Sequence, residues 1–362
     1  MMHTVYTVIA GLVVFGIVVF VHEMGHYLAA RWRGVQVDVF SIGFGPALTS
    51  WQDRVGTKWQ ISLLPLGGYV KLHGFEKHPD APAEEGDENA FNRKSVLSRA
   101  LVTVAGPVFN FLLTIILFAV LLSCFGKPEA KPDIGSLAAN GAASRAGLKL
   151  GDEITKLDGH RILSIGDIQT QVAAHPGAVM QVSVMREGKE LELPVTLDRL
   201  TQDGHEVGRL GVGFMLKHGA PLPVYKAIPA AFGQTWDMCA NMLEGIWQIV
   251  SGQRSAKQLS GTIGIIHMSG QAVDYGVASA VGFVALLSLN LGLINLFPVP
   301  MLDGGHLLFY ACEAVLGRPL SERTQGYALQ FGLLLVVALF VYSTVNDLRG
   351  LGVFHWLFAH GG

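Results

Sequence analysis

The sequence predicts a polytopic α-helical membrane protein with four transmembrane helices and an inserted α+β domain. Half of its 362 residues are hydrophobic and only 15% are charged, whereas soluble chains carry about 25% charged residues. Four apolar runs, at 5–30, 101–125, 280–302 and 327–342, each have close to the roughly 20 residues that cross a hydrocarbon core. The longest stretch between them has the Gly- and Pro-punctuated, strand-rich pattern of a soluble domain.

These runs divide the chain. The expected parts are a first span at 1–30, a loop with a β-hairpin at 31–100, a second span at 101–125, the α+β domain at 126–220, a helix and connector at 221–279, a third span at 280–305, a loop at 306–326, a fourth span at 327–346 and a tail at 347–362. Residues 1–6 contain no Lys or Arg, so the first run lacks the n-region of a signal peptide and is expected to be retained.

The distribution of Lys and Arg predicts the orientation. Both 31–100 and 306–326 carry these residues close to the ends of the spans, which is typical of cytoplasmic loops. Both termini and the region 126–279 are therefore expected on the opposite side of the membrane.

Net charge and cysteine content bear on two kinds of binding site, one for nucleic acid and one for a metal. A net charge of −2 gives no field that would attract nucleic acid. Cys124, Cys239 and Cys312 are scattered and odd in number, which predicts neither a CxxC metal site nor a disulfide framework. Any metal is therefore expected to be held by histidine and carboxylate.

The first apolar run contains the motif His22-Glu23-Met24-Gly25-His26. On a helix, two histidines four apart lie on one face, so both imidazoles can bind one Zn²⁺. Glu23 is turned by about 100° and can reach an attacking water without being a ligand, as a general base must. The alternative is a polar cluster that holds helices together. A metal accounts more completely for two imidazoles and a carboxylate at a depth where such groups are costly.

A third ligand is expected from the third span. Catalytic zinc takes three protein ligands and keeps one position open. In 290–305, NLGLINLFPVPMLDGG, Asp303 is the first acidic residue and lies at the end expected to face the cytoplasm. The expected topology thus puts Asp303 at the depth of the two histidines, although Asp-Gly-Gly taken alone is also ordinary turn chemistry.

Pro298 and Pro300 should break this span, because proline cannot continue the helical hydrogen-bond ladder. Irregular backbone at membrane depth is tolerated only where it is buried in protein or lines a wet cavity. We therefore expect water to reach this point, and expect freed backbone groups that could pair with an extended peptide.

Residues 128–215 are expected to form the α+β domain. In 142–159, AASRAGLKLGDEITKLDG, a short helix, a Gly-Asp turn and a strand follow one another in an order that resembles a PDZ domain. Further strands are expected at 179–184 and 190–195. The alternative is an unrelated α+β module. The run 211–214 would form the carboxylate-binding loop of a circularly permuted PDZ domain, or else an edge strand with glycines.

Residues 224–250 are apolar but interrupted by three charged residues, and they include Trp236 and Trp247. This pattern is typical of an amphipathic helix on a membrane surface. A helix packed within the soluble domain is the open alternative.

The motif His-Glu-x-x-His in the first span, Asn-x-x-Pro-x-Pro-x-Leu-Asp-Gly-Gly in the third and the PDZ-like insert between them resemble the site-2 protease family, in particular its bacterial RseP-type branch. The resemblance covers nearly the whole chain. It implies an intramembrane zinc metalloprotease in which His22, His26 and Asp303 hold Zn²⁺ and Glu23 is the catalytic base. It also implies that Asn295 and Pro298 position substrate. The best-known members of this branch carry two PDZ domains, whereas this chain has room for one.

Smaller motifs extend the resemblance. The run 105–110, AGPVFN, matches the family's Gly-x-x-x-Asn pattern, with Asn110 facing inward; ordinary small-residue helix packing is the alternative. Gly67 and Gly68, in the run 65–71 (PLGGYVK), match a membrane-associated β-hairpin loop whose edge could accept a substrate strand; a plain surface hairpin is the alternative. Asn110, Gly67 and Gly68 are expected to position substrate.

The implied substrates are single-span membrane proteins in regulated intramembrane proteolysis, such as anti-sigma factors already shortened by another protease, or signal-peptide remnants. The implied partners are these substrates and membrane lipid, with no nucleic acid. The implied location is the bacterial inner membrane, with the PDZ-like domain periplasmic as a size filter and the active site toward the cytoplasm. The rival functions are a membrane PDZ adaptor with a non-catalytic zinc site, and a metal-ion transporter, which the absence of inverted repeats disfavours.

Overall fold

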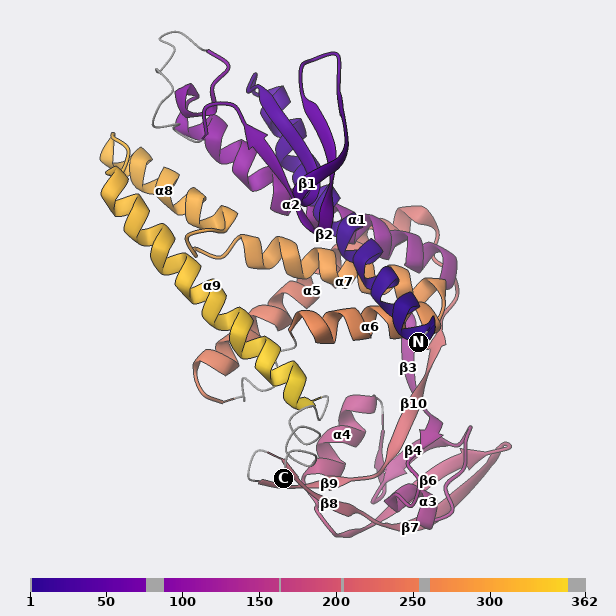
Figure 1. The fold of residues 1–362 in the computed structure, drawn as a ribbon. Coiled ribbons are helices and arrows are strands. Elements are labelled where there is room, and N and C mark those ends of the chain that lie inside the picture. The colour runs from indigo at the N-terminus through magenta and orange to yellow at the C-terminus, as the bar shows by residue number, and fades with distance from the viewer. Residues whose placement is uncertain (1, 76–87, 163, 203–204, 254–260, 351–362) are drawn as a thin grey trace. The chain divides into compact units, whose positions relative to one another are not determined.

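The computed structural model describes residues 2–75, 88–162, 164–202, 205–253 and 261–350 (Figure 1). The chain forms two compact units. Unit 1 comprises Met1–Leu121 and Val224–Gly362, and unit 2, Leu122–Pro223, is inserted between them. Most of the expected tail at 347–362 lies outside the described residues.

Unit 1 is mainly helical. Its elements are α1 (Met2–Trp32), β1 (Val37–Gln52), β2 (Lys58–Leu72), the short 3-10 helix η1 (Phe91–Arg93), α2 (Val96–Phe125), α5 (Val224–Val250), α6 (Thr262–Asp274), α7 (Val277–Asn295), α8 (Asp303–Leu316) and α9 (Glu322–Gly350). Four of these helices, α1, α2, α7 and α9, are long and apolar enough to cross a membrane, over Tyr6–Trp32, Val96–Phe125, Val277–Asn295 and Glu322–Leu348. The prediction of four candidate spans is confirmed.

The third span is shorter than the expected 280–305. Helix α7 ends at Asn295, and Asp303 begins a separate helix, α8. Pro298 and Pro300 lie in the intervening turn, which also contains Met301 at φ 90°. The proline-rich motif therefore spans a helix end, a turn and a helix start, and α8 occupies much of the region expected as a loop at 306–326.

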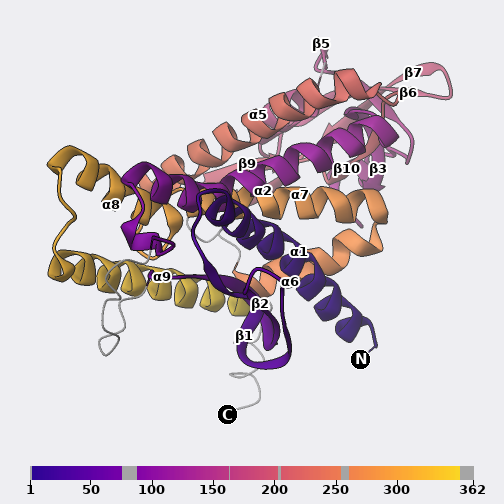
Figure 2. The same cartoon turned by 90° about the horizontal axis from the view of Figure 1, so that it is seen from above.

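Glycines bring the helices of unit 1 into close contact. A Cβ on Gly25 of α1 would lie 2.5 Å from the Ala105 carbonyl oxygen of α2, so the two helices touch backbone to backbone. Gly292 does the same for α7, because a Cβ there would lie 3.2 Å from both Asn110 Cβ and the Pro107 carbonyl oxygen. Figures 1 and 2 show α1, α2 and α7 side by side within this unit. The contacts place one face of α2 against both α1 and α7.

The two strands of unit 1 are long and double back on themselves. Strands β1 and β2 form an antiparallel pair. Within it, the segment 39–42 is registered against both 58–61 and 68–71, and 58–61 is also registered against 49–52. Stacked Phe40 and Trp59 rings, with centroids 4.4 Å apart, pack on the sheet. Among the described residues, 68–72 has a partner segment on one side only, so it forms an edge of this sheet.

Helix α5 groups with unit 1 and not with the inserted domain. Ala227, Ala231 and Thr235, four residues apart, are buried along one face. Phe232 and Trp236 are exposed. The helix is therefore amphipathic, as expected, and the alternative that packed it within unit 2 is wrong.

Unit 2 is an α+β domain. Its elements are β3 (Pro128–Leu137), α3 (Ala142–Arg145), β4 (Glu153–Leu157), β5 (His160–Arg161), α4 (Ile165–Ala173), β6 (Val179–Arg186), β7 (Lys189–Thr196), β8 (Asp198–Gln202), β9 (His205–Arg209) and β10 (Val212–His218). The main sheet has the order β10-β3-β4-β6-β7, with β5 beside β4, and β8 pairs with β9. A core of apolar residues, including Ile134, Ile154 and Val182, is fully buried.

Local sequence explains the turn between β6 and β7 and the start of α4 in unit 2. Glu187 and Gly188 both have positive φ and join β6 to β7, as a type I′ hairpin turn requires. Ser164 and Asp167 form a reciprocal capping box at the start of α4, which satisfies two otherwise free N–H groups.

Candidate metal centre

The motif in the first span lies on a continuous stretch of α1. His22 and His26 are four residues apart, so their rings lie on one face of the helix, with centroids 4.8 Å apart and planes at 85°. Both side chains are largely buried, at 8% and 13% exposed. Gly25 lets α2 cover this face at contact distance.

Asp303 reaches the histidines from the first turn of α8. The two glycines after it make this possible. A Cβ on Gly304 would collide with the Leu296 and Phe297 carbonyl oxygens, and one on Gly305 would collide with the Val299 carbonyl oxygen. The start of α8 can therefore pack directly on the turn that follows α7, which turns the Asp303 carboxylate toward α1.

Helix α8 is also fixed at its far end. Glu313 receives two hydrogen bonds from the Arg99 guanidinium of α2, at 2.6 and 3.1 Å. The same guanidinium lies 5.0 Å from the centre of the Tyr310 ring. A bidentate, half-buried pair of this kind has a defined geometry, so it ties the helix that carries Asp303 to the helix that covers the histidines.

Three ligand-type atoms from His22, His26 and Asp303 lie within 4.8 Å of one another. His22 Nε2 and His26 Nε2 are 3.2 Å apart, and Asp303 Oδ2 lies 3.2 Å from the first and 3.5 Å from the second. Tetrahedral zinc with bonds of about 2.0–2.1 Å places its ligand atoms about 3.3 Å apart. The observed triangle has the dimensions of one face of such a tetrahedron, so the donor set fits zinc.

Hydrogen bonding supports a cation at this triangle. His26 Nδ1 lies 2.9 Å from the Val102 carbonyl oxygen, which can only accept, so Nδ1 carries the proton and the lone pair of neutral His26 is on Nε2. Asp303 Oδ2 is buried and satisfies no hydrogen-bond geometry within the described part of the chain. Two electron-pair donors that face each other in a buried site need a shared cation.

Glu23 lies beside the triangle without belonging to it. It follows His22 on α1, and its carboxylate accepts a hydrogen bond from the backbone of Val70 in β2. A Cβ on Gly68 would lie 3.3 Å from Glu23 Cγ. The edge segment 68–72 of the β1–β2 sheet therefore runs directly past this carboxylate. Gly67 instead faces the Phe44 ring, at φ 139°, and so supports the bend of the strand.

The amide of Asn295, the last residue of α7, also reaches the centre, with Nδ2 3.3 Å from His22 Nε2. Pro298 lies three residues further on, in the turn that leads to Asp303. The structure thus brings Asn295 to the histidines and puts Pro298 in the backbone segment that links Asn295 to Asp303.

Asn110 faces inward, as the Gly-x-x-x-Asn pattern predicts. Its side chain is fully buried and its Nδ2 is 3.2 Å from His22 Nδ1, on the side of the ring away from Asp303. It contacts a histidine and not an open path, which differs from the expected role in positioning substrate. The Gly-x-x-x-Asn pattern predicted a close approach of helices at Gly106, and the structure shows one against both imidazoles. The Val102 carbonyl on the same helix was not singled out from the sequence.

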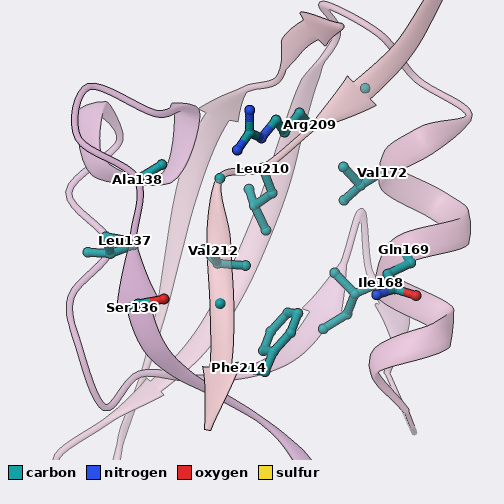
Figure 3. A pocket seen from close by; sticks show the side chains of 13 residues that line it. Ser136, Leu137, Ala138, Ile168, Gln169, Val172, Arg209, Leu210, Val212 and Phe214 are labelled. Carbon is teal, nitrogen blue, oxygen red and sulfur yellow. The ribbon is translucent and has the colours of Figure 1, made fainter. Parts of the chain in front are cut away.

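Unit 2 contains a separate cavity of about 630 Å³. It lies between α4 and β10, the edge strand of the main sheet (Figure 3). Ile168 and Val172 of α4 face Leu210, Val212 and Phe214 across it, and Arg209 lies at the rim. Apolar side chains and polar groups together line this cavity beside an edge strand, which suits an extended peptide.

A membrane-spanning chain with two histidines, a carboxylate and an adjacent glutamate has the site of a zinc metalloprotease. The model of peptidase family M50, the site-2 protease family, matches residues 10–339. The chain therefore belongs to peptidase family M50.

Curated relatives agree with this membership. A protein from Rhizobium meliloti whose name describes a zinc metalloprotease is 38% identical over 375 residues, 98% of this chain and 97% of the relative. Metalloprotease MmpA from Caulobacter vibrioides is 38% identical over 384 residues, 96% of each chain. The chain is a zinc metalloprotease, and Zn²⁺ is its metal. Among solved structures, the PDZ domain of the SdrC-like protein from Listeria innocua matches 25% of this chain and 99% of its own, with 21% identity and a TM-score of 0.20, which is too weak a likeness to assign the fold of unit 2.

Proposed function

We propose that this protein is an intramembrane metalloprotease that hydrolyses peptide bonds in or near the spans of single-span membrane proteins. Within it, His22, His26 and Asp303 hold the zinc and Glu23 is the catalytic base. The observation that carries the proposal is the triangle of ligand atoms at 3.2, 3.2 and 3.5 Å, with the Glu23 carboxylate beside it on α1, a helix that can cross a membrane.

When bound, zinc supplies a Lewis acid that acidifies water and polarises a carbonyl. Glu23 accepts the proton from the attacking water and delivers it to the leaving amide nitrogen. The Asn295 amide, 3.3 Å from His22 Nε2, donates a hydrogen bond to the substrate carbonyl as charge develops on it. The turn at Pro298 keeps this amide and Asp303 on the same side of the centre.

The substrate enters as a strand along 68–72. This segment pairs with 37–42 of β1 and passes Glu23 at Gly68 and Val70. An extended peptide added to such an edge exposes its carbonyls, which a helical substrate hides. Gly67 and Gly68 contribute by allowing the strand to bend and to approach α1.

We place the protein in a bacterial inner membrane, with unit 2 in the periplasm and the metal centre toward the cytoplasm. Unit 2 acts as a PDZ-like size filter, and its cavity beside β10 accepts an extended chain end. The substrates are then membrane proteins already shortened on the periplasmic side, for example anti-sigma factors, or signal-peptide remnants. Lipid is the other partner.

The test compares purified wild type with Glu23→Gln on a tagged single-span substrate in bilayers, with and without a zinc chelator. We expect the wild type to cut only with zinc, and Glu23→Gln to retain zinc but lose cleavage by more than about 10²-fold, the lower range for general-base catalysis. Glu192→Gln, an exposed change on β7, is the matched control and should cut normally. If wild type and Glu23→Gln bind zinc and neither cuts any of several substrates, the protein is a membrane adaptor and the proposal fails.

A further inference from the structure

Asn110 is buried deep within unit 1, next to the metal centre. Its exposed fraction is 0%, and its side-chain amide lies 3.2 Å from His22 Nδ1. His22 uses its other nitrogen, Nε2, for the triangle with His26 and Asp303. The amide therefore meets the imidazole on the side away from the proposed zinc.

Polar side chains from two helices hold the Asn110 backbone in place. The Ser288 hydroxyl of α7 donates to the backbone carbonyl oxygen of Asn110 at 2.9 Å, and the Thr114 hydroxyl of α2 donates to the same backbone oxygen at 3.0 Å. Thr114 also lies 3.1 Å from the Ala285 carbonyl oxygen of α7. Asn110, Thr114 and Ser288 are all 0% exposed. These buried hydrogen bonds restrain the backbone of α2 that carries the Asn110 amide.

The two histidines need the same support and receive it from different groups. A histidine that binds metal through Nε2 carries its proton on Nδ1 and needs an acceptor there. His26 has the Val102 carbonyl oxygen at 2.9 Å. His22 has the Asn110 amide, whose Oδ1 is buried and has no other hydrogen-bond partner within the described residues. A half-turn of the amide presents this oxygen to Nδ1–H, since the amide nitrogen and oxygen exchange places.

We propose that Asn110 is a positioning residue of the metal centre, which accepts the His22 Nδ1 proton and thereby fixes the tautomer and ring orientation that put Nε2 on the metal. The proposal rests on the proposed zinc ligand set. Because the Ser288 hydroxyl holds the Asn110 backbone, α7 supports the position on α2 from which the amide reaches His22 on α1. Substrate does not contact Asn110.

The test measures zinc affinity of the purified full chain by competition with a chromogenic chelator. Asn110→Leu keeps the approximate shape but removes the acceptor, and we expect it to weaken zinc binding about 10–100-fold, as loss of such partners does. Asn110→Asp restores an acceptor and should bind zinc more tightly than Asn110→Leu. Thr235→Val on α5 is the matched control, since it removes a buried hydroxyl that bonds to the Ala231 carbonyl oxygen and takes no part in the support of Asn110, and its affinity should stay close to wild type.

Three results would overturn the proposal: unchanged affinity in Asn110→Leu, an equal loss in Thr235→Val, or no recovery in Asn110→Asp. The first and third would show that His22 needs no acceptor here, and the second would show that Asn110 serves only packing. His22→Ala separates this proposal from the one on which it rests. If His22→Ala leaves zinc affinity unchanged, the ligand set itself is wrong, whatever Asn110 does.

Discussion

Replacing Gly106 by alanine should displace the metal ligands directly. Gly106 lies on α2 opposite both imidazoles. A Cβ at this position would lie 2.6 Å from His26 Cε1 and 2.8 Å from His22 Cε1, and closer still to His26 Nε2. Ordinary van der Waals contact begins at 3.4 Å. One methyl group would therefore collide with both rings.

The size of the effect follows from these distances. The rings or the helix must separate by nearly 1 Å to relieve the contacts, whereas a zinc site tolerates only about 0.2 Å in its bond lengths. The rings cannot take up this movement independently, because His26 Nδ1 is bound to the backbone of the same helix at Val102. A misplacement of about 1 Å costs on the order of 100-fold in a catalytic site, and we expect a loss of that order in both zinc affinity and cleavage.

The assay is the zinc competition described above, with far-UV circular dichroism and thermal unfolding to check that the variant is folded. Gly16→Ala on α1 is the matched control, because a Cβ there meets nothing within 4 Å and alanine favours a helix by about 1 kcal/mol over glycine. If Gly106→Ala is folded and binds zinc as tightly as Gly16→Ala does, α2 can retreat without disturbing the ligands, and the reasoning is refuted.

Two further predictions concern unit 2. Hydrogen bonds from Arg186, at 2.7 Å, hold the pKa of Asp152 below its usual value. The pair therefore stabilises the folded domain above about pH 4, where the unfolded-state carboxyl is ionised. This stabilisation is lost as the pH falls through the lower pKa of Asp152 in the folded state. Arg186→Gln should lower the stability of unit 2 at neutral pH and flatten this acid dependence, as measured by hydrogen exchange of β4 and β6 amides corrected for intrinsic rates. An equally steep loss of stability with falling pH in the variant would contradict the prediction. Deleting 128–220 should extend cleavage to substrates that keep their outer domains. The ends that the deletion joins already lie side by side, because His218 is registered against Pro128. Unchanged selectivity between a long and a short form of the same substrate would exclude unit 2 as a size filter.

The sequence predicted the metal centre because its chemistry is concentrated in short motifs. Four-residue spacing on a helix fixes the relation of His22 to His26 whatever the tertiary structure does. Asp303 needed a second argument, the matching depth of two span ends, and the structure brings it to within 3.5 Å of both histidines. The ligand positions were thus predictable from local periodicity and topology alone.

The supports of the centre were not predictable in the same way, since they depend on which faces of the helices meet. Nothing in the sequence pairs Arg99 with Glu313, which are 214 residues apart. The Gly-Gly after Asp303 indicated a turn, whereas in the structure both glycines lie within α8 and permit its close contact with the preceding turn. The doubling back of β1 and β2 was also missed, because alternation along a strand does not specify its neighbours.

The Gly-x-x-x-Asn motif indicates which side Asn110 faces, but not which residue it contacts. The spacing from Gly106 predicts that both residues face inward, but not what they face. Because α1 crosses α2 at Gly25, the two imidazoles lie against one stripe of α2, formed by Val102, Gly106 and Asn110 at intervals of four. The ring planes are at 85°, so their Nδ1 atoms reach opposite ends of this stripe. Val102 offers its backbone carbonyl at one end and Asn110 offers its amide at the other. Between them, Gly106 has no side chain that would collide with the rings. The same four-residue period that aligns the two imidazoles on α1 therefore dictates what α2 presents to them at Val102, Gly106 and Asn110.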